Sequence, residues 1–171
     1  MAQRGPPLLM QINAAAGLPS DAERAFRVPA MNTPLAEQLK SLYAAFRLAN
    51  IDFVLNAFDD QVEFISYSPL EVFPFLGHHR GKAAMEGVLR AGYEQFEFVT
   101  YDPVFMVCEK EDAAVMVFAR FIQRRTGRSI TVMIAHFIRF RQGRIVELRE
   151  FMDSFSAVKQ LLGRRLDLEE H

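Results

Sequence analysis

The sequence has no tryptophan and little cysteine, with Cys108 as the single thiol among 171 residues. One cysteine cannot form an internal disulfide, which favours a reducing compartment and lets Cys108 serve as a small buried hydrophobe. No apolar run reaches the roughly 20 residues that a membrane-spanning helix needs. Pro6 and Pro7 interrupt the short apolar patch near the start. We therefore expect a cytoplasmic protein with no secretory signal and no membrane partner.

An excess of charge of either sign is also missing. The chain has 20 basic and 21 acidic residues, for a formal net charge of −1. This balance gives no basic surface for nucleic acid. The sequence contains no phosphate-binding loop, no Ser-His-Asp signature and no dinucleotide fingerprint. The adjacent pair His78 and His79 has no cysteine or carboxylate at metal-ligand spacing. We therefore predict no nucleic-acid partner, no cofactor and no metal.

Phenylalanine is abundant instead, with 16 residues in a chain that is 50% hydrophobic. This length and composition suit one domain with a sizeable core. Phenylalanine carries no polar group, so these residues can either pack as an ordinary core or line a dry cavity.

The pattern along the chain divides it into three parts. Residues 1–31 show no periodicity and many Pro and Gly residues, which predicts a flexible arm. Residues 32–163 form the predicted domain, and residues 164–171 form a tail. Helical spacing occurs in residues 34–49, 51–58, 82–96 and 156–162. Strand alternation occurs in residues 62–67 and in four longer runs between residues 97 and 153. Helices followed by strands indicate an α+β domain.

The long strand runs are apolar on both faces. Val115, Val117 and Ala119 share one face, and Met116 and Phe118 share the other. A half-exposed antiparallel sheet should be polar on one side. The helices of this chain suffice to cover one face only. We therefore expect a homodimer that forms through the outer face of the sheet.

Two stretches carry a resemblance to a known family. The segment FRQGRIVELREFMD, residues 140–153, looks like a penultimate strand, a glycine turn and a last strand. The segment VEFISYSP is followed by GHHRG at residues 77–81. With the order of elements, residues 33–162 resemble the nuclear-transport-factor-2-like superfamily, in particular its SnoaL-like (polyketide-cyclase-like) and ketosteroid-isomerase-like branches. The resemblance implies a cone-shaped α+β barrel, in which a curved antiparallel sheet wraps around the N-terminal helices.

The same resemblance implies a pocket for a hydrophobic small molecule, such as a polyketide- or steroid-like compound or an aromatic catabolite. This fold hosts isomerases, cyclases, epoxide hydrolases, dehydratases and non-catalytic proteins. Two hypotheses follow. The chain is either an isomerase, cyclase or dehydratase that moves a proton on a hydrophobic carbonyl compound without a metal, or a non-catalytic ligand-binding or structural dimer of the same fold.

Tyr43 and His136 are the first candidates for catalysis. Tyr43 lies on an apolar helical stripe, where its hydroxyl needs either a backbone carbonyl or a substrate as partner. His136 projects with Ile134 and Ile138 from a central strand, as a core histidine or as an acid or base. By resemblance, the two fall where ketosteroid isomerases hold a tyrosine and a protonated carboxylic acid. Together they would form a two-donor oxyanion site.

The sequence departs from its relatives at two carboxylates. Isomerases of this kind have an aspartate before the loop proline, where this chain has Ser68. The epoxide-hydrolase branch has an Arg-x-Asp pair, and here Arg120 is followed two residues later by Ile122. Asp153 is a third catalytic candidate, with a helix N-cap as its alternative role. Glu147 and Glu150 are expected to pair with arginines across the strands. The predicted ligand-binding residues are Tyr67, Ser68, Phe75, His79, Arg120 and Ile134.

Overall fold

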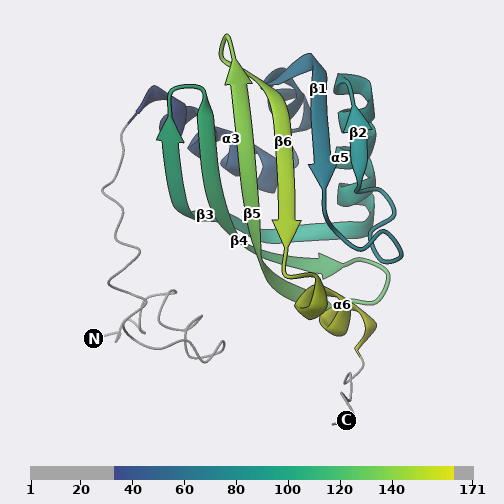
Figure 1. Cartoon of the computed structure of the whole chain (residues 1–171). Helices are drawn as coiled ribbons and strands as arrows, with labels where there is room; N and C mark the ends of the chain where they lie inside the picture. The colour runs from purple at the N-terminus through teal and green to yellow at the C-terminus, as the bar shows by residue number, and fades with distance from the viewer. Residues whose placement is uncertain (1–32, 164–171) are drawn as a thin grey trace, which may run out of the picture. The chain divides into compact units, whose positions relative to one another are not determined.

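The computed structural model describes residues 33–163. The predicted arm, residues 1–31, and the predicted tail, residues 164–171, lie outside the described residues. The helices are α3 (Pro34–Arg47), α4 (Ile51–Asn56), α5 (Lys82–Gln95) and α6 (Ser154–Leu162). The strands are β1 (Phe58–Ser66), β2 (His78–Arg80), β3 (Phe96–Glu109), β4 (Asp112–Gln123), β5 (Ser129–Arg141) and β6 (Arg144–Met152) (Figure 1). None of these helices is long and apolar enough to cross a membrane.

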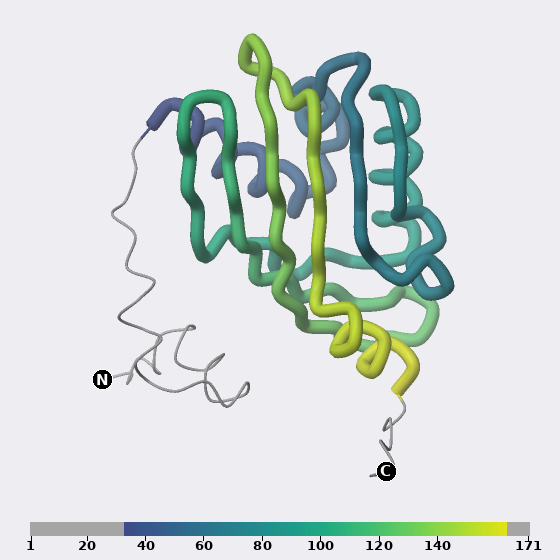
Figure 2. The backbone as a smooth tube through the Cα atoms, in the orientation of Figure 1, coloured from purple at the N-terminus to yellow at the C-terminus, as the bar shows by residue number. Residues whose placement is uncertain are grey.

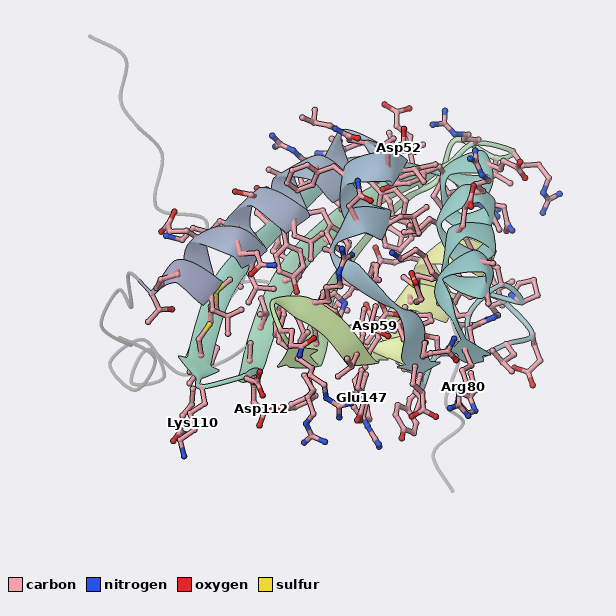
Figure 3. All side chains as sticks on the ribbon, turned by 90° about the horizontal axis from the view of Figure 1, so that it is seen from above. Asp52, Asp59, Arg80, Lys110, Asp112 and Glu147 are labelled. Carbon is pink, nitrogen blue, oxygen red and sulfur yellow. The ribbon has the colours of Figure 1, made fainter. Side chains whose placement is uncertain are left out.

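The strands form one six-stranded sheet in the order β2-β1-β6-β5-β4-β3. Strands β1 and β6 run parallel, and the other neighbours are antiparallel. The sheet is curved and stays open, with β2 and β3 at its two edges, and the lower parts of β4 and β5 bend toward α5 (Figure 2). Helices α3, α4 and α5 lie on one face of the sheet (Figures 1 and 3). The α+β architecture predicted from the sequence is therefore confirmed.

Local chemistry fixes the ends of the helices. Thr33 Oγ1 accepts a hydrogen bond from the Ala36 amide at 3.2 Å, and Pro34 occupies the first turn, where its missing N–H costs nothing. Asn50 caps α4 in the same way. Gly163 ends α6 in the left-handed conformation, at a φ of 64°.

Two strand predictions were incomplete. Strand β1 begins at Phe58 rather than Val62, because Phe58 pairs with Ile145 of β6 before the register shifts ahead of Glu63. Strand β2 was not expected, since its three residues are too few to show a periodicity. It forms by pairing with β1, from Glu63 opposite Arg80 to Ile65 opposite His78. Both the start of β1 and the presence of β2 therefore depend on pairing with residues that are distant in the sequence.

The sheet buries one face and leaves the other partly exposed. Val115, Val117 and Ala119 of β4 are buried beneath the helices. On the opposite face, Met116 is half-buried and the Phe137 side chain is 51% exposed. Within residues 33–163, the helices α3, α4 and α5 therefore cover the inner face, and the outer face keeps apolar side chains in contact with solvent.

Candidate active site

A cavity of about 120 Å³ lies between the sheet and the helices. Its walls are made by apolar side chains of α3, α4, α5 and all strands except β2, together with the loop after β1. The lining residues with polar side chains are Tyr43, Tyr101, His136 and Glu150. Each of these four is at most 8% exposed. The polar chemistry of the cavity is thus limited to two phenols, one imidazole and one carboxyl group.

These four side chains contact one another through His136. The Tyr43 hydroxyl lies 2.7 Å from Nδ1 of His136, and Glu150 Oε2 lies 3.2 Å from Nε2. The Tyr101 hydroxyl is 3.5 Å from the same Nε2, a long contact. A phenol and a carboxylate therefore occupy opposite sides of one imidazole ring.

The second carboxylate oxygen of Glu150 leads to two buried serines. Ser66 Oγ donates to Glu150 Oε1 at 2.8 Å, and Ser68 Oγ lies 2.8 Å from Ser66 Oγ. A serine hydroxyl has one proton to donate, and that of Ser66 goes to Glu150. The Ser68 hydroxyl therefore donates to the Ser66 oxygen. A continuous chain of hydrogen bonds thus runs from Tyr43 through His136, Glu150 and Ser66 to Ser68.

Three neighbouring strands bring this chain of side chains together. His136 of β5 stands opposite Glu150 of β6 in the antiparallel register. Ser66 of β1 stands opposite the same Glu150 in the parallel register. Side chains opposite each other on one face of a sheet lie within contact distance. Helix α3 then supplies Tyr43 from above, because Leu39, Leu42 and Tyr43 form its buried side.

The hydrogen-bond partners decide where the protons lie. An ionised carboxylate only accepts hydrogen bonds, so Nε2–H of neutral His136 donates to Glu150. Nδ1 is then an acceptor and takes the hydroxyl proton of Tyr43. When His136 carries a second proton, Nδ1–H donates to the Tyr43 oxygen instead. The Tyr43 hydroxyl is then free to donate into the cavity. The two arrangements differ by one proton, which is the requirement for acid-base chemistry.

Burial keeps both phenols protonated. It raises the pKa of Tyr43 well above its usual value of 10, and the negative charge of Glu150 raises it further. The pKa of Tyr101 is raised for the same two reasons. At neutral pH both hydroxyls therefore carry a proton.

The structure brings some of the predicted site residues to the cavity. Tyr43 and His136 both line the cavity and are hydrogen-bonded to each other. Ile134 and Phe75 line the cavity. Ser68 is buried at the end of the hydrogen-bond chain and is not part of the cavity wall.

Four other predicted residues lie away from the cavity wall. Asp153 is exposed and caps α6, with Oδ1 accepting from the Ser156 amide at 3.0 Å. Arg120 is exposed on the outer face of β4. Tyr67 is 51% exposed and stacks on Phe151. His79 is half-buried, and its Nε2 lies 3.0 Å from the Leu76 carbonyl oxygen. Within residues 33–163, no three His, Cys, Asp or Glu side chains are placed to hold a metal ion.

The expectation that Glu150 pairs with an arginine was wrong. Glu147 does so, with Arg149 and with Arg139 at 3.6 Å. Glu150 points inward instead, because it shares a face of β6 with Leu148. Strand alternation around Leu148 could have revealed this orientation. Tyr101 was also missed, because register shifts on both sides of it disturb the alternation of β3.

Comparison with known proteins identifies relatives of this fold. The family model described as "SnoaL-like domain" matches residues 39–148. A solved structure from Rhodopseudomonas palustris, named "Putative Isomerase", is 30% identical over 78% of this chain and 99% of its own, with a TM-score of 0.70. An NTF2-like protein from Burkholderia xenovorans is 23% identical over 74% and 94% of the two chains, with a TM-score of 0.63.

A LEH-like epoxide hydrolase from M. tuberculosis shares the fold at 15% identity. The alignment covers 74% of this chain and 88% of that protein, with a TM-score of 0.61. No protein with a curated description matches the chain.

Proposed function

Because this chain belongs to the SnoaL-like domain family, we propose that its cavity binds a small hydrophobic carbonyl compound and catalyses proton transfer on it. The observation that carries the proposal is the hydrogen-bonded series Tyr43, His136 and Glu150 in an otherwise apolar cavity. The series has the order of a hydroxyl, an imidazole and a carboxylate, in which the carboxylate orients the imidazole and stabilises its charged form. Here the hydroxyl group is a phenol.

The proposed reaction uses each group once. The Tyr101 hydroxyl donates a hydrogen bond to the substrate carbonyl oxygen, because its own contact with His136 is long. The proton on the carbon next to the carbonyl moves to the Tyr43 oxygen while Tyr43 passes its own proton to Nδ1 of His136. The electron pair of the broken C–H bond forms the C=C bond of an enolate. Glu150 stabilises the imidazolium, and Tyr101 stabilises the enolate oxygen.

Return of the proton completes the reaction. Delivery to a different carbon gives an isomer, and delivery to a hydroxyl on the β-carbon releases water and gives a dehydration product. The raised pKa of Tyr43 disfavours a free phenolate. The two proton movements through Tyr43 must therefore be concerted. This scheme assigns the oxyanion donor to Tyr101, whereas the sequence suggested Tyr43 and His136.

The experiment measures exchange of the α-protons of cyclohexanone and acetophenone in D₂O by NMR. The protein should accelerate exchange, and His136→Gln should abolish the acceleration while the far-UV circular dichroism is unchanged. Arg120→Gln, at an exposed position on the outer face, is the matched control and should exchange at the native rate. Equal rates for the native protein and His136→Gln would exclude His136 from the reaction.

A non-catalytic binding protein is the second candidate function. Every buried side-chain nitrogen and oxygen of residues 33–163 already has a hydrogen-bond partner without a ligand. Complete satisfaction of polar groups is what a stable core requires, so this observation favours a passive role for the network. Binding of the two ketones without any exchange above the buffer rate would select this second function.

We also propose a homodimer through the outer face of the sheet. Tyr67, Phe137 and Phe151 form an exposed aromatic cluster there, with ring centroids 4.4 Å apart for Tyr67 and Phe151 and 5.9 Å apart for Phe137 and Phe151. Charges of both signs lie beside it, since Arg139 pairs with Asp112 and Arg149 pairs with Glu147, and Figure 3 shows Asp112 and Glu147 directed away from the helices. A two-fold axis places the same patch on both partners, so a patch with both signs can complement itself.

A further inference from the structure

We propose that the cavity accepts an uncharged compound with a single ring, and that Gly92 of α5 leaves the room that this ring needs. This inference rests on the proposed function, since it names the class of compound that the same cavity would hold. Three features support it: the volume of the cavity, the charge of its lining and the position of Gly92.

The volume of the cavity suits one ring. Pockets for drug-sized ligands measure roughly 300–1,000 Å³, and this cavity measures about 120 Å³. An engineered apolar cavity of about 150 Å³ holds benzene. The two volumes are of the same order, so a single six-membered ring is about the largest group that the cavity can hold, and a fused-ring polyketide or a steroid does not fit. The broader substrate class suggested by the sequence is narrowed accordingly.

The charge of the lining excludes anions. No lysine or arginine lines the cavity, and its charged group is the Glu150 carboxylate, which is 8% exposed. A ligand carboxylate buried beside Glu150 would meet a like charge without a cationic partner, at a large desolvation cost. A neutral carbonyl or hydroxyl group can instead pair with the phenols and the imidazole.

The aromatic walls connect the polar groups to Gly92. Tyr101 contacts Phe98, Phe98 contacts Phe121, and Phe121 contacts Phe96, with ring centroids 5.1 to 5.8 Å apart along this series. Phe96 lies 6.3 Å from Phe75, which borders Gly92. The ring of the compound would therefore lie among these phenylalanines, with its oxygen at the polar end.

Gly92 is a glycine that the backbone does not require. It lies inside α5, is buried and lines the cavity, and its φ is not positive. Alanine would favour the helix more. A methyl group at this position would meet Phe75 at 3.6 Å, an ordinary contact. The protein thus forgoes a better helix former at a position where a side chain would occupy ligand space.

The same helix offers a matched control. Gly87 of α5 is exposed, and a methyl group there would meet no atom within 4 Å. Gly87→Ala and Gly92→Ala therefore bring the same gain in helix propensity. Only Gly92→Ala places the added carbon in the cavity.

The test compares ligands in matched pairs by isothermal titration calorimetry at pH 7. Acetophenone should bind at least tenfold more tightly than 2-acetylnaphthalene, and benzaldehyde at least tenfold more tightly than benzoate. Gly92→Ala should weaken acetophenone binding at least fivefold, and Gly87→Ala should change it less than twofold. Both variants should melt at or above the native temperature. Phe75→Ala, which enlarges the same region, should improve binding of 2-acetylnaphthalene at least fivefold.

The outcomes separate this inference from the proposed function. Equal binding of the one-ring and two-ring ketones, or native affinity in Gly92→Ala with no gain in Phe75→Ala, would overturn the limit on size. Equal binding of benzoate and benzaldehyde would overturn the requirement for an uncharged ligand. The predicted order of affinities without α-proton exchange would support this inference and reject catalysis. Failure of every probe to bind would reject both.

Discussion

His136 and Glu150 face each other across the β5–β6 pair and meet inside the protein, with 3.2 Å between Nε2 and Oε2. The two residues are at most 8% exposed. A carboxylate on one side of an imidazole fixes its tautomer, so the opposite nitrogen presents a lone pair to the Tyr43 hydroxyl. The direction of proton movement in the proposed reaction depends on this one contact.

Glu150→Gln should therefore reduce catalysis much more than stability. The amide keeps the size of the side chain but cannot stabilise an imidazolium by charge. We expect kcat for α-proton exchange to fall by roughly 10²- to 10⁴-fold, the usual contribution of acid-base groups, with little change in KM. Glu147→Gln, on the outer side of the same strand, is the control and should retain the native kcat. A native kcat in Glu150→Gln would show that the carboxylate takes no part.

Ser66→Ala should destabilise the fold more than Ser68→Ala. Loss of the Ser66 hydroxyl leaves Glu150 Oε1 buried without its 2.8 Å donor, and an unsatisfied buried polar group costs about 1–3 kcal/mol. Loss of the Ser68 hydroxyl leaves the bond between Ser66 and Glu150 intact. Urea unfolding followed by circular dichroism gives both free energies. The reverse order, or equal values below about 0.5 kcal/mol, would contradict the hydrogen-bond chain.

Alkaline pH should destabilise the protein through its buried tyrosines. Burial raises the pKa of Tyr43 and of Tyr101 well above 10 in the folded state. The unfolded chain ionises near 10. Above this pH the unfolded state therefore binds fewer protons, and the free energy of unfolding falls as pH rises. The stabilisation is fully present below pH of about 10 and is lost as pH approaches the folded pKa.

Tyr43→Phe measures how much Tyr43 alone contributes to the fall in the free energy of unfolding at alkaline pH. Each fully shifted group contributes a slope of about 1.4 kcal/mol per pH unit, so this variant should show a shallower decline above pH of about 10 by that amount. The measurement is best made in a Cys108→Ala background, because burial also raises the pKa of the Cys108 thiol and acts in the same direction. An unchanged slope in Tyr43→Phe would show that Tyr43 ionises as readily in the folded protein as in the unfolded chain.

Most of the fold could be predicted from the sequence, because the long helices and strands show a clear hydrophobic periodicity. The turn at Gly143 separates β5 from β6, and the capping pair Thr33 and Pro34 begins α3, both as predicted. The short β2 and the start of β1 could not be predicted, since they depend on partners far along the chain.

The candidate site was harder to predict than the fold. Tyr43 and His136 were found from their apolar faces and from the family resemblance, because both lie on regular elements. Glu150 was expected to pair with arginines together with Glu147, because both alternate with Arg149 along the last strand, but of the two only Glu147 does so. The register shift next to Phe140 puts Ile145 and Leu148 on the buried side, although they are three positions apart, an odd spacing that regular alternation would place on opposite faces. Alternation counted from Ile145 therefore places Glu150 outside, whereas alternation counted from Leu148 places it inside.

Phe137→Glu should convert the proposed dimer to a monomer. Phe137 is 51% exposed, so a charge at this position harms the fold little, but it would be buried without a partner in an interface formed by the outer face. Sedimentation velocity should give the mass of two chains for the native protein and of one chain for the variant. Leu48→Glu is the control, since Leu48 is a 74% exposed hydrophobic residue at the end of α3, on the helical side of the sheet. It should leave the mass unchanged. A native protein that sediments as one chain, or a Phe137→Glu variant that remains a dimer, would show that the outer face does not hold a second copy.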